Sequence, residues 1–198
     1  MGLLSAGLIR KLINELAFIS QPPYDSKEEW DKRVEFIEGS QFDLTTSRLF
    51  IRKPNQSPPF MGRYSRELGD LEEIAPQYNE FRKEYTWVLE AGKHYVAMTG
   101  EIVTMPPTLK GILRPRSSDF IMGLYPGVTD ISPGFSGMLR FGLYASETCE
   151  IGRGSRQITM AVVTIEGDEE TDTYQGIWGK SGGSVDKITT EDGGERPH

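Results

Sequence analysis

One short segment of the chain carries side chains suited to binding phosphate. Residues 114–119 read Arg-Pro-Arg-Ser-Ser-Asp and directly follow a short apolar run. Guanidinium groups next to hydroxyls on a tight turn can bind phosphate oxygens through paired, charge-assisted hydrogen bonds. We therefore treat Arg116, Ser117 and Ser118 as candidate phosphate-binding residues, although a solvated turn is the default interpretation of these residues alone.

A second segment places a carboxylate between two apolar runs. Residues 126–137 read Pro-Gly-Val-Thr-Asp-Ile-Ser-Pro-Gly-Phe-Ser-Gly, with Asp130 on a predicted turn. The glycines allow a ligand to approach the backbone closely. Asp130 could orient a water molecule or bind a sugar hydroxyl, whereas most aspartates in turns only form the turn.

Several classes of site are excluded by residue type. The chain has one cysteine, Cys149, and two histidines, His94 and His198. It therefore lacks the Cys/His set of a zinc nucleobase deaminase and the histidine placement of a Ser-His-Asp or Cys-His hydrolase. Gly-Lys-Ser at 179–181 resembles the end of a P-loop, but that motif requires glycine at position 174, where Tyr174 stands.

Bulk composition predicts a soluble globular protein. Hydrophobic residues make up 37% and charged residues 26% of the 198 positions, and the formal net charge is −7. With no basic patch evident, this charge argues against a general nucleic-acid or anionic-membrane surface, so an anionic ligand needs local arginine, lysine or a metal ion. A single cysteine and no apparent targeting or membrane-spanning segment indicate a cytoplasmic location.

The elements that position these segments can be outlined from periodicity and turn residues. Ser5 caps a predicted helix over residues 5–18, and residues 27–37 form a short helix or a loop. A strand region follows at 40–51. We expect an irregular insertion over residues 52–84, with a possible short helix at 79–83.

The rest of the chain predicts a compact all-β unit. Short apolar runs alternate with turn residues, at 86–89, 94–98, 102–105, 111–114, 120–125, 138–144 and 158–165. The fold class is therefore mostly β with an N-terminal helix. We expect one domain over residues 1–182 and a flexible C-terminal tail over 183–198.

The two candidate segments, in this order, resemble the dUTPase and dCTP deaminase superfamily. The Arg-Ser-Ser at 116–118 matches its phosphate-binding motif, and residues 131–137 resemble its Ile-Asp-Pro-Gly-Phe-x-Gly. Four further segments are similar: the N-terminal helix, Ser-Gln-Phe-Asp-Leu at 40–44, Gly-Ser-Arg at 154–156, and Tyr-Gln-Gly at 174–176.

The resemblance implies a β-clip or distorted jelly-roll fold, and a homotrimer with sites at subunit interfaces. The ligand it implies is a deoxynucleoside triphosphate with Mg²⁺, bound by the phosphates rather than by protein ligands. The activity is either cleavage of dUTP to dUMP and diphosphate or zinc-independent deamination of dCTP. Tyr174, Gln175 and Lys180 are implied as further phosphate-binding residues. Thr129, Ser132 and Phe135 are implied for the sugar and base.

Three positions depart from the family pattern. In an ungapped alignment with the deaminase branch, Ser132 replaces the sugar-binding aspartate and Gly142 replaces the catalytic glutamate. Ile121 replaces an arginine that follows Arg-Ser-Ser. In an alternative register, Gly-Val-Thr-Asp at 127–130 resembles the Gly-Val-Ile-Asp of the dUTPase branch, with two additional residues before Phe135. Asp130 is then the residue that positions the attacking water.

Three hypotheses follow from these matches and departures. The first is an active deoxynucleotide enzyme, more plausibly a dUTPase-like diphosphatase than a deaminase. The second is a nucleotide-binding or regulatory protein that has lost the chemistry. The third is a purely structural trimer of the same fold.

Overall fold

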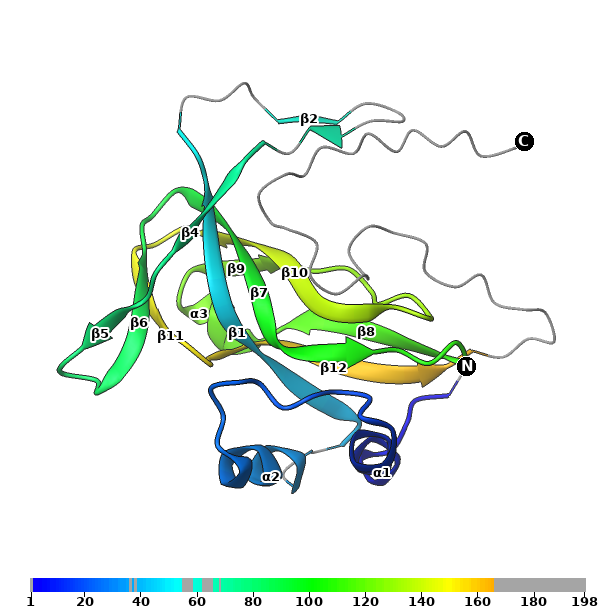
Figure 1. Cartoon of the computed structure of the whole chain (residues 1–198). Coiled ribbons are helices and arrows are strands. Elements are labelled where there is room, and N and C mark those ends of the chain that lie inside the picture. The colour runs from blue at the N-terminus through cyan, green and yellow to red at the C-terminus, as the bar shows by residue number, and fades with distance from the viewer. Residues whose placement is uncertain are drawn as a thin grey trace.

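A computed structural model describes residues 2–165, apart from residues 36, 38, 55–58, 62–65 and 68. The fold is mostly β, with two N-terminal helices packed below a curved sheet (Figure 1). The predicted fold class is therefore confirmed. Tyr174, Gln175, Lys180 and the predicted tail lie outside the described residues.

The N-terminal helices cover one end of the sheet. Helix α1 spans Ala6–Leu16; the Ser5 hydroxyl accepts the Leu8 amide as an N-cap, and the helix buries its Ile9–Ile13 face. This confirms the helix predicted over residues 5–18. Helix α2 spans Lys27–Glu35, which resolves the choice between helix and loop at 27–37.

The main sheet is antiparallel and contains seven strands. Its order is β8 (Leu109–Pro115), β12 (Arg156–Thr164), β1 (Gln41–Arg52), β7 (Lys93–Thr104), β10 (Ser136–Ala145) and β9 (Leu124–Gly127), with β4 (Leu71–Ile74) also paired to β1. The sheet curves until its two ends approach, and an isolated bridge joins Gly111 of β8 to Ile131, just after β9. The enclosed core is continuous and apolar.

Part of the predicted insertion forms regular structure. A three-stranded sheet of β11 (Cys149–Gly152), β6 (Glu84–Leu89) and β5 (Gln77–Asn79) projects from one side (Figure 1). A two-stranded sheet pairs β2 (Phe60–Met61) with β3 (Arg66–Glu67). The possible helix at 79–83 is wrong: this segment is a hairpin turn, in which the Asn79 side chain accepts the amides of Phe81 and Arg82.

Two strand predictions also need correction. The runs at 94–98 and 102–105 form one strand, because Gly100 does not interrupt it; a Cβ there would lie 2.0 Å from the Tyr24 hydroxyl, so the glycine serves packing. The run at 120–125 is divided between helix α3 (Ser117–Ile121) and strand β9. The first residues of this run are helical because polar residues cap the segment at its N-terminus, and apolar alternation does not decide their structure.

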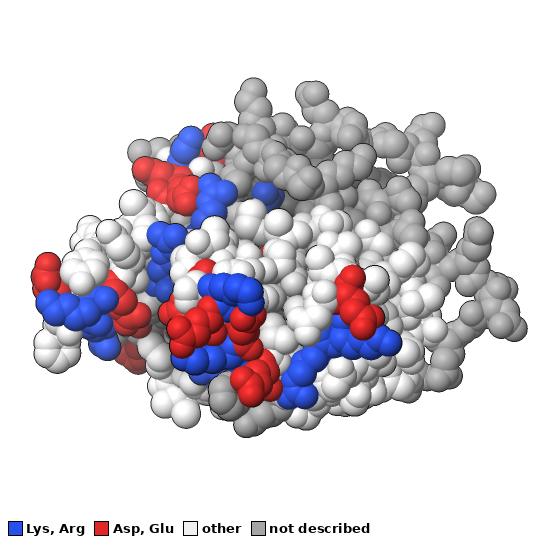
Figure 2. Space-filling view, turned by 60° about the horizontal axis from the view of Figure 1, so that its bottom comes forward, with Lys and Arg blue, Asp and Glu red and all other residues white. Residues whose placement is uncertain are grey.

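The face that carries the two helices has mixed charge. Figure 2 shows clusters on this face in which acidic and basic side chains lie next to one another, and uncharged surface separates these clusters. The pairs include Lys27–Asp31 and Lys32–Glu28 on α2, and Lys11–Glu15 on α1. No continuous basic surface forms among the described residues on this face.

Candidate functional site

The first candidate site is a basic cavity of about 900 Å³ where α2, β1, β8 and β12 meet. Five basic side chains and one acidic side chain, Asp43, are among its lining residues. The lining consists of Lys32, Arg33, Ile37, Gln41, Phe42, Asp43, Arg114, Pro115, Arg116, Ser117, Arg156 and Thr159. Although the whole chain is acidic, basic side chains outnumber acidic ones in the lining of this cavity, which therefore suits an anion.

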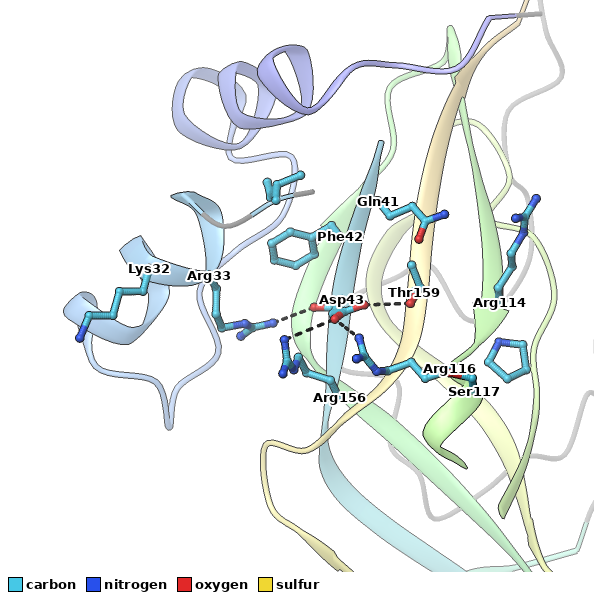
Figure 3. A pocket seen from close by; sticks show the side chains of 12 residues that line it. Lys32, Arg33, Gln41, Phe42, Asp43, Arg114, Arg116, Ser117, Arg156 and Thr159 are labelled. Carbon is cyan, nitrogen blue, oxygen red and sulfur yellow. Dashed lines mark hydrogen bonds and ion pairs between the residues drawn. The ribbon is translucent and has the colours of Figure 1, made fainter. Parts of the chain in front are cut away.

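Asp43 organises the charges of this cavity (Figure 3). Its carboxylate forms an ion pair with Arg116, and its Oδ2 lies 3.5 Å from Arg156 Nη1. The Thr159 hydroxyl donates to Oδ1 at 2.8 Å. Arg116 is thus held in a fixed orientation, and its guanidinium, which has five N–H groups, keeps donors for a ligand.

A buried ion network attaches α2 to the sheet beside Asp43. Glu101 of β7 is fully buried and accepts the Thr45 amide at 2.9 Å and the Thr45 hydroxyl at 2.8 Å. Arg33 of α2 lies 2.5 Å from both Glu101 and Asp25, and it also donates to the Asp43 carbonyl at 2.9 Å. One wall of the basic cavity therefore depends on a buried charge pair.

The predicted Arg-Ser-Ser segment begins helix α3 rather than a simple turn. Arg116 is the N-cap residue, and the Asp119 side chain accepts the Arg116 amide at 3.3 Å, while the Asp119 amide donates to the Arg116 carbonyl at 3.1 Å. Burial raises the pKa of the Asp119 carboxyl to about 6, since only 3% of this residue is exposed. Ser117 and Ser118 are exposed at the start of the helix, and Ile121 projects into solvent.

The second candidate site is a mainly apolar cavity of about 490 Å³ at the open end of the sheet. It contains the predicted catalytic and nucleoside residues together. Asp130, Thr129 and Ser132 contribute polar groups, and the buried Phe135 lies in the wall. Asp130 Oδ2 forms an ion pair with Lys110 Nζ at 2.7 Å.

Gly142 of β10 also lines this cavity. It pairs with Gly127 of β9 on one side and with Val96 of β7 on the other. A Cβ at Gly142 would have no described atom within 4 Å. The position therefore leaves open space in the cavity, where a longer side chain could be accommodated.

The structure does not bring the two predicted halves together within one chain. Asp130 is paired to Lys110 at the start of β8, while Arg116 follows the end of this strand. Five residues of extended strand separate Lys110 from Arg116, and the six residue steps span about 20 Å. One phosphate therefore cannot contact Ser117 and a water on Asp130 of the same chain.

Sequence reasoning missed several residues of these sites. Asp43 and Arg156 lie in segments that carry the family resemblance. The resemblance could therefore have indicated them as site residues, but it was not used to assign them a role. Lys110 gave no signal, because its proximity to Asp130 depends on the bridge between Gly111 and Ile131. Asp119 could have been noticed as the acidic N3 residue of a capped helix.

Metal ligands and membrane spans can be assessed only for the described residues. Within them, no group of three or more His, Cys, Asp or Glu side chains comes together. Asp43 is the single carboxylate of the basic cavity, and a donor set of this kind suits Mg²⁺ that is bound chiefly by the phosphates of a ligand. In the same part of the chain, no helix is long and apolar enough to cross a membrane.

Comparison with known proteins decides the family. A family model described as dCTP deaminase-like matches residues 4–162. The chain belongs to the dCTP deaminase-like family. The suspected membership of the dUTPase and dCTP deaminase superfamily is thereby confirmed, and the match spans both candidate cavities.

Individual proteins similar to this chain include one relative by sequence and two solved structures. A probable deoxyuridine 5′-triphosphate nucleotidohydrolase from Aeropyrum pernix is 31% identical over 112 residues, which cover 55% of this chain and 69% of that protein. The crystal structure of 2′-deoxycytidine 5′-triphosphate deaminase from Agrobacterium tumefaciens has a TM-score of 0.57 at 18% identity. That match covers 81% of this chain and 47% of the deaminase, so this chain spans about half the length of that protein. The dUTPase of Staphylococcus bacteriophage 80alpha has a TM-score of 0.36 at 19% identity, over 61% of this chain and 91% of the dUTPase.

The family and fold are therefore established, and the chemistry is a separate question. The predicted dUTPase-like fold agrees with the deaminase superposition. The roles of Asp130, Arg116 and the other site residues, the homotrimer and the cytoplasmic location stay predictions. The division at residue 182 also stays a prediction, because it falls outside the described residues.

Proposed function

We propose that the protein hydrolyses a deoxynucleoside triphosphate, as a dUTPase-like diphosphatase that releases diphosphate from dUTP. The observation that carries this proposal is the presence of two separate cavities. One is lined mainly by basic side chains, and the other is mainly apolar and contains Asp130. A triphosphate fits the first and a pyrimidine nucleoside fits the second. dCTP deamination is a weaker candidate, because Gly142 offers no side chain for proton transfer.

The residues present can supply the steps of in-line attack. Asp130 would accept a proton from a water molecule directed at the α-phosphorus, and Phe135 would pack against the deoxyribose. Arg116, Ser117 and Ser118 would bind phosphate oxygens through charge-assisted hydrogen bonds. Mg²⁺ bound to the phosphates would neutralise charge that develops on their oxygens, and water on the metal could hydrogen-bond to Asp43.

The separation of the two halves supports a site shared between chains. Because about 20 Å of β8 separates Asp130 from Arg116, a complete site needs the phosphate half of one chain and the nucleoside half of another. An exposed apolar group lies between the two halves in the sequence: Phe120, Ile121 and Met122 of the α3 segment, beside Tyr125 of β9. This surface suits contact with a second copy in the proposed homotrimer.

The test combines turnover with complementation. Purified protein with Mg²⁺ should release diphosphate from dUTP, and both Asp130→Asn and the double variant Ser117→Ala/Ser118→Ala should be inactive. Mixing the two inactive variants during refolding should restore about a quarter of the activity, since random assembly places both intact halves at one site in four. The absence of product from dUTP, dCTP and other triphosphates would exclude the proposal.

A second function is favoured by specific residues. Gly142 and Ser132 both lack the acidic group of the deaminase branch, which suits a protein that binds a deoxynucleotide without turning it over. This candidate predicts calorimetric binding of dUTP or dCTP without product. A purely structural trimer instead predicts no thermal stabilisation by any of these nucleotides.

A further inference from the structure

We propose that Lys110 is a positioning residue that orients the Asp130 carboxylate toward the attacking water. This inference rests on the proposed function of Asp130. The Lys110 Nζ lies 2.7 Å from Asp130 Oδ2, which leaves Oδ1 to accept a hydrogen bond from water. A general base must lie within hydrogen-bond reach of the proton it accepts, so the orientation of this carboxylate is a functional requirement.

The backbone on both sides of the ion pair is fixed. Gly111 and Ile131 exchange two backbone hydrogen bonds, of 3.1 Å and 2.8 Å, as an antiparallel bridge. Lys110 is therefore the diagonal neighbour of Asp130 across this bridge, and its long side chain spans the diagonal to reach the carboxylate. A Cβ at Gly111 would lie 2.9 Å from both Ile131 and Met105, and only glycine allows this close approach. The buried Ile131 side chain anchors the same point.

The segment after Asp130 is anchored independently. The Gly134 amide donates to the Met105 carbonyl at 3.0 Å, and the Met105 amide donates to the Phe135 carbonyl at 2.7 Å. The path of the chain from residue 131 to 135 is therefore set by the strands below it. The Asp130 side chain is the part left to be oriented, because 45% of it is exposed.

Stability alone does not account for this ion pair. The Lys110 side chain is 39% exposed, and an ion pair in such a setting contributes little to folding. Fixing a reacting group has a larger effect, since a small displacement can lower a rate by about 100-fold. The geometry thus assigns Lys110 a role in orienting Asp130 rather than in folding.

The test compares three single variants with the wild type in Mg²⁺-dependent dUTP turnover. Lys110→Met should lower kcat about 10- to 100-fold with KM within about twofold, and Lys110→Arg should keep most of the activity. Lys93→Met is the matched control. It removes an ion pair to Glu90 of the same 2.7 Å length and similar exposure, outside both cavities. All three variants should unfold within about 4 °C of the wild type, because each alters only an exposed pair.

A double variant separates positioning from other roles. The Asp130→Asn variant and the Asp130→Asn/Lys110→Met double variant should have the same residual rate, measured in single turnover at high protein concentration, since Lys110 acts through Asp130. An unchanged kcat in Lys110→Met, a loss confined to KM, or additive losses in the double variant would each overturn the inference alone. No turnover by the wild type, or full turnover by Asp130→Asn, would overturn the proposed function and this inference with it.

Discussion

Replacing Asp119 by asparagine should stabilise the protein at neutral and alkaline pH. The Asp119 carboxyl is 3% exposed, and burial raises its pKa from the ordinary value of 3.8 to about 6. Because the folded state binds the proton more tightly, the stabilisation is fully present below pH 3.8 and is lost as the pH rises through 6. Asparagine stays neutral throughout, and its Oδ1 can still accept the Arg116 amide.

The size of this effect follows from the two pKa values. Relative to a neutral side chain, the aspartate costs the folded state about 0.5 kcal/mol at pH 4, about 1.6 kcal/mol at pH 5 and about 3 kcal/mol at pH 8. Asp119→Asn should therefore raise the Tm at pH 8 by about 6–12 °C. The gain should nearly vanish at pH 4.

Paired urea titrations of wild type and variant at pH 4, 5 and 8 measure this difference directly. Other carboxylates titrate in the same range, so the difference between the two proteins is the informative quantity. Asp31→Asn, on the exposed face of α2, is the matched control and should show no such slope. A stability difference that is constant between pH 4 and pH 8, or a variant less stable at pH 8, would refute the reasoning.

Three further substitutions test the supports of the cavities. Arg33→Met should cost about 3–5 kcal/mol, measured by urea unfolding, because Glu101 is then left as an unpaired buried charge, whereas Lys27→Met on the same helix should cost less than about 1 kcal/mol. Gly142→Ala should leave the free energy of unfolding within about 1 kcal/mol of the wild type, since a Cβ has open space there. Gly111→Ala should lower it by about 1–3 kcal/mol through collision with Ile131 and Met105, and equal effects of the two glycine variants would contradict the packing argument.

Local pattern predicted much of the fold. The Ser5 cap and the apolar spacing after it gave the position of α1, and the apolar runs gave β1, β8, β10 and β12. Strand β11 was missed because it has only four residues, Cys149–Gly152, and pairs with β6, which is distant in the sequence. The prediction divided β7 into two runs around Gly100. This glycine makes room for the Tyr24 ring, which is far away in the sequence.

The candidate site likewise combines residues that a local sequence motif predicts with residues that only long-range strand pairing brings together. Arg116, Ser117 and Ser118 could be proposed from the sequence because one short segment carries all three, and Asp130 because it lies among turn residues. The partner of Arg116 is Asp43, 73 positions earlier, and it becomes a neighbour only through the pairing of β1, β12 and β8. Such contacts depend on sheet order, which periodicity does not specify.

Strand β8 connects the two halves of the site and also keeps them apart. Its first residues hold Asp130 through Lys110 and Gly111, and its last residue leads directly into the Arg116 cap. Because β8 pairs with β12 along its whole length, the strand cannot bend enough to bring its ends together. In a monomer with this geometry, the phosphate-binding half of the proposed site lies at one end of β8 and the nucleoside half lies at the other end. The proposed function therefore predicts that dissociation into monomers abolishes turnover, as a consequence of the length of β8 and without any change in the residues themselves.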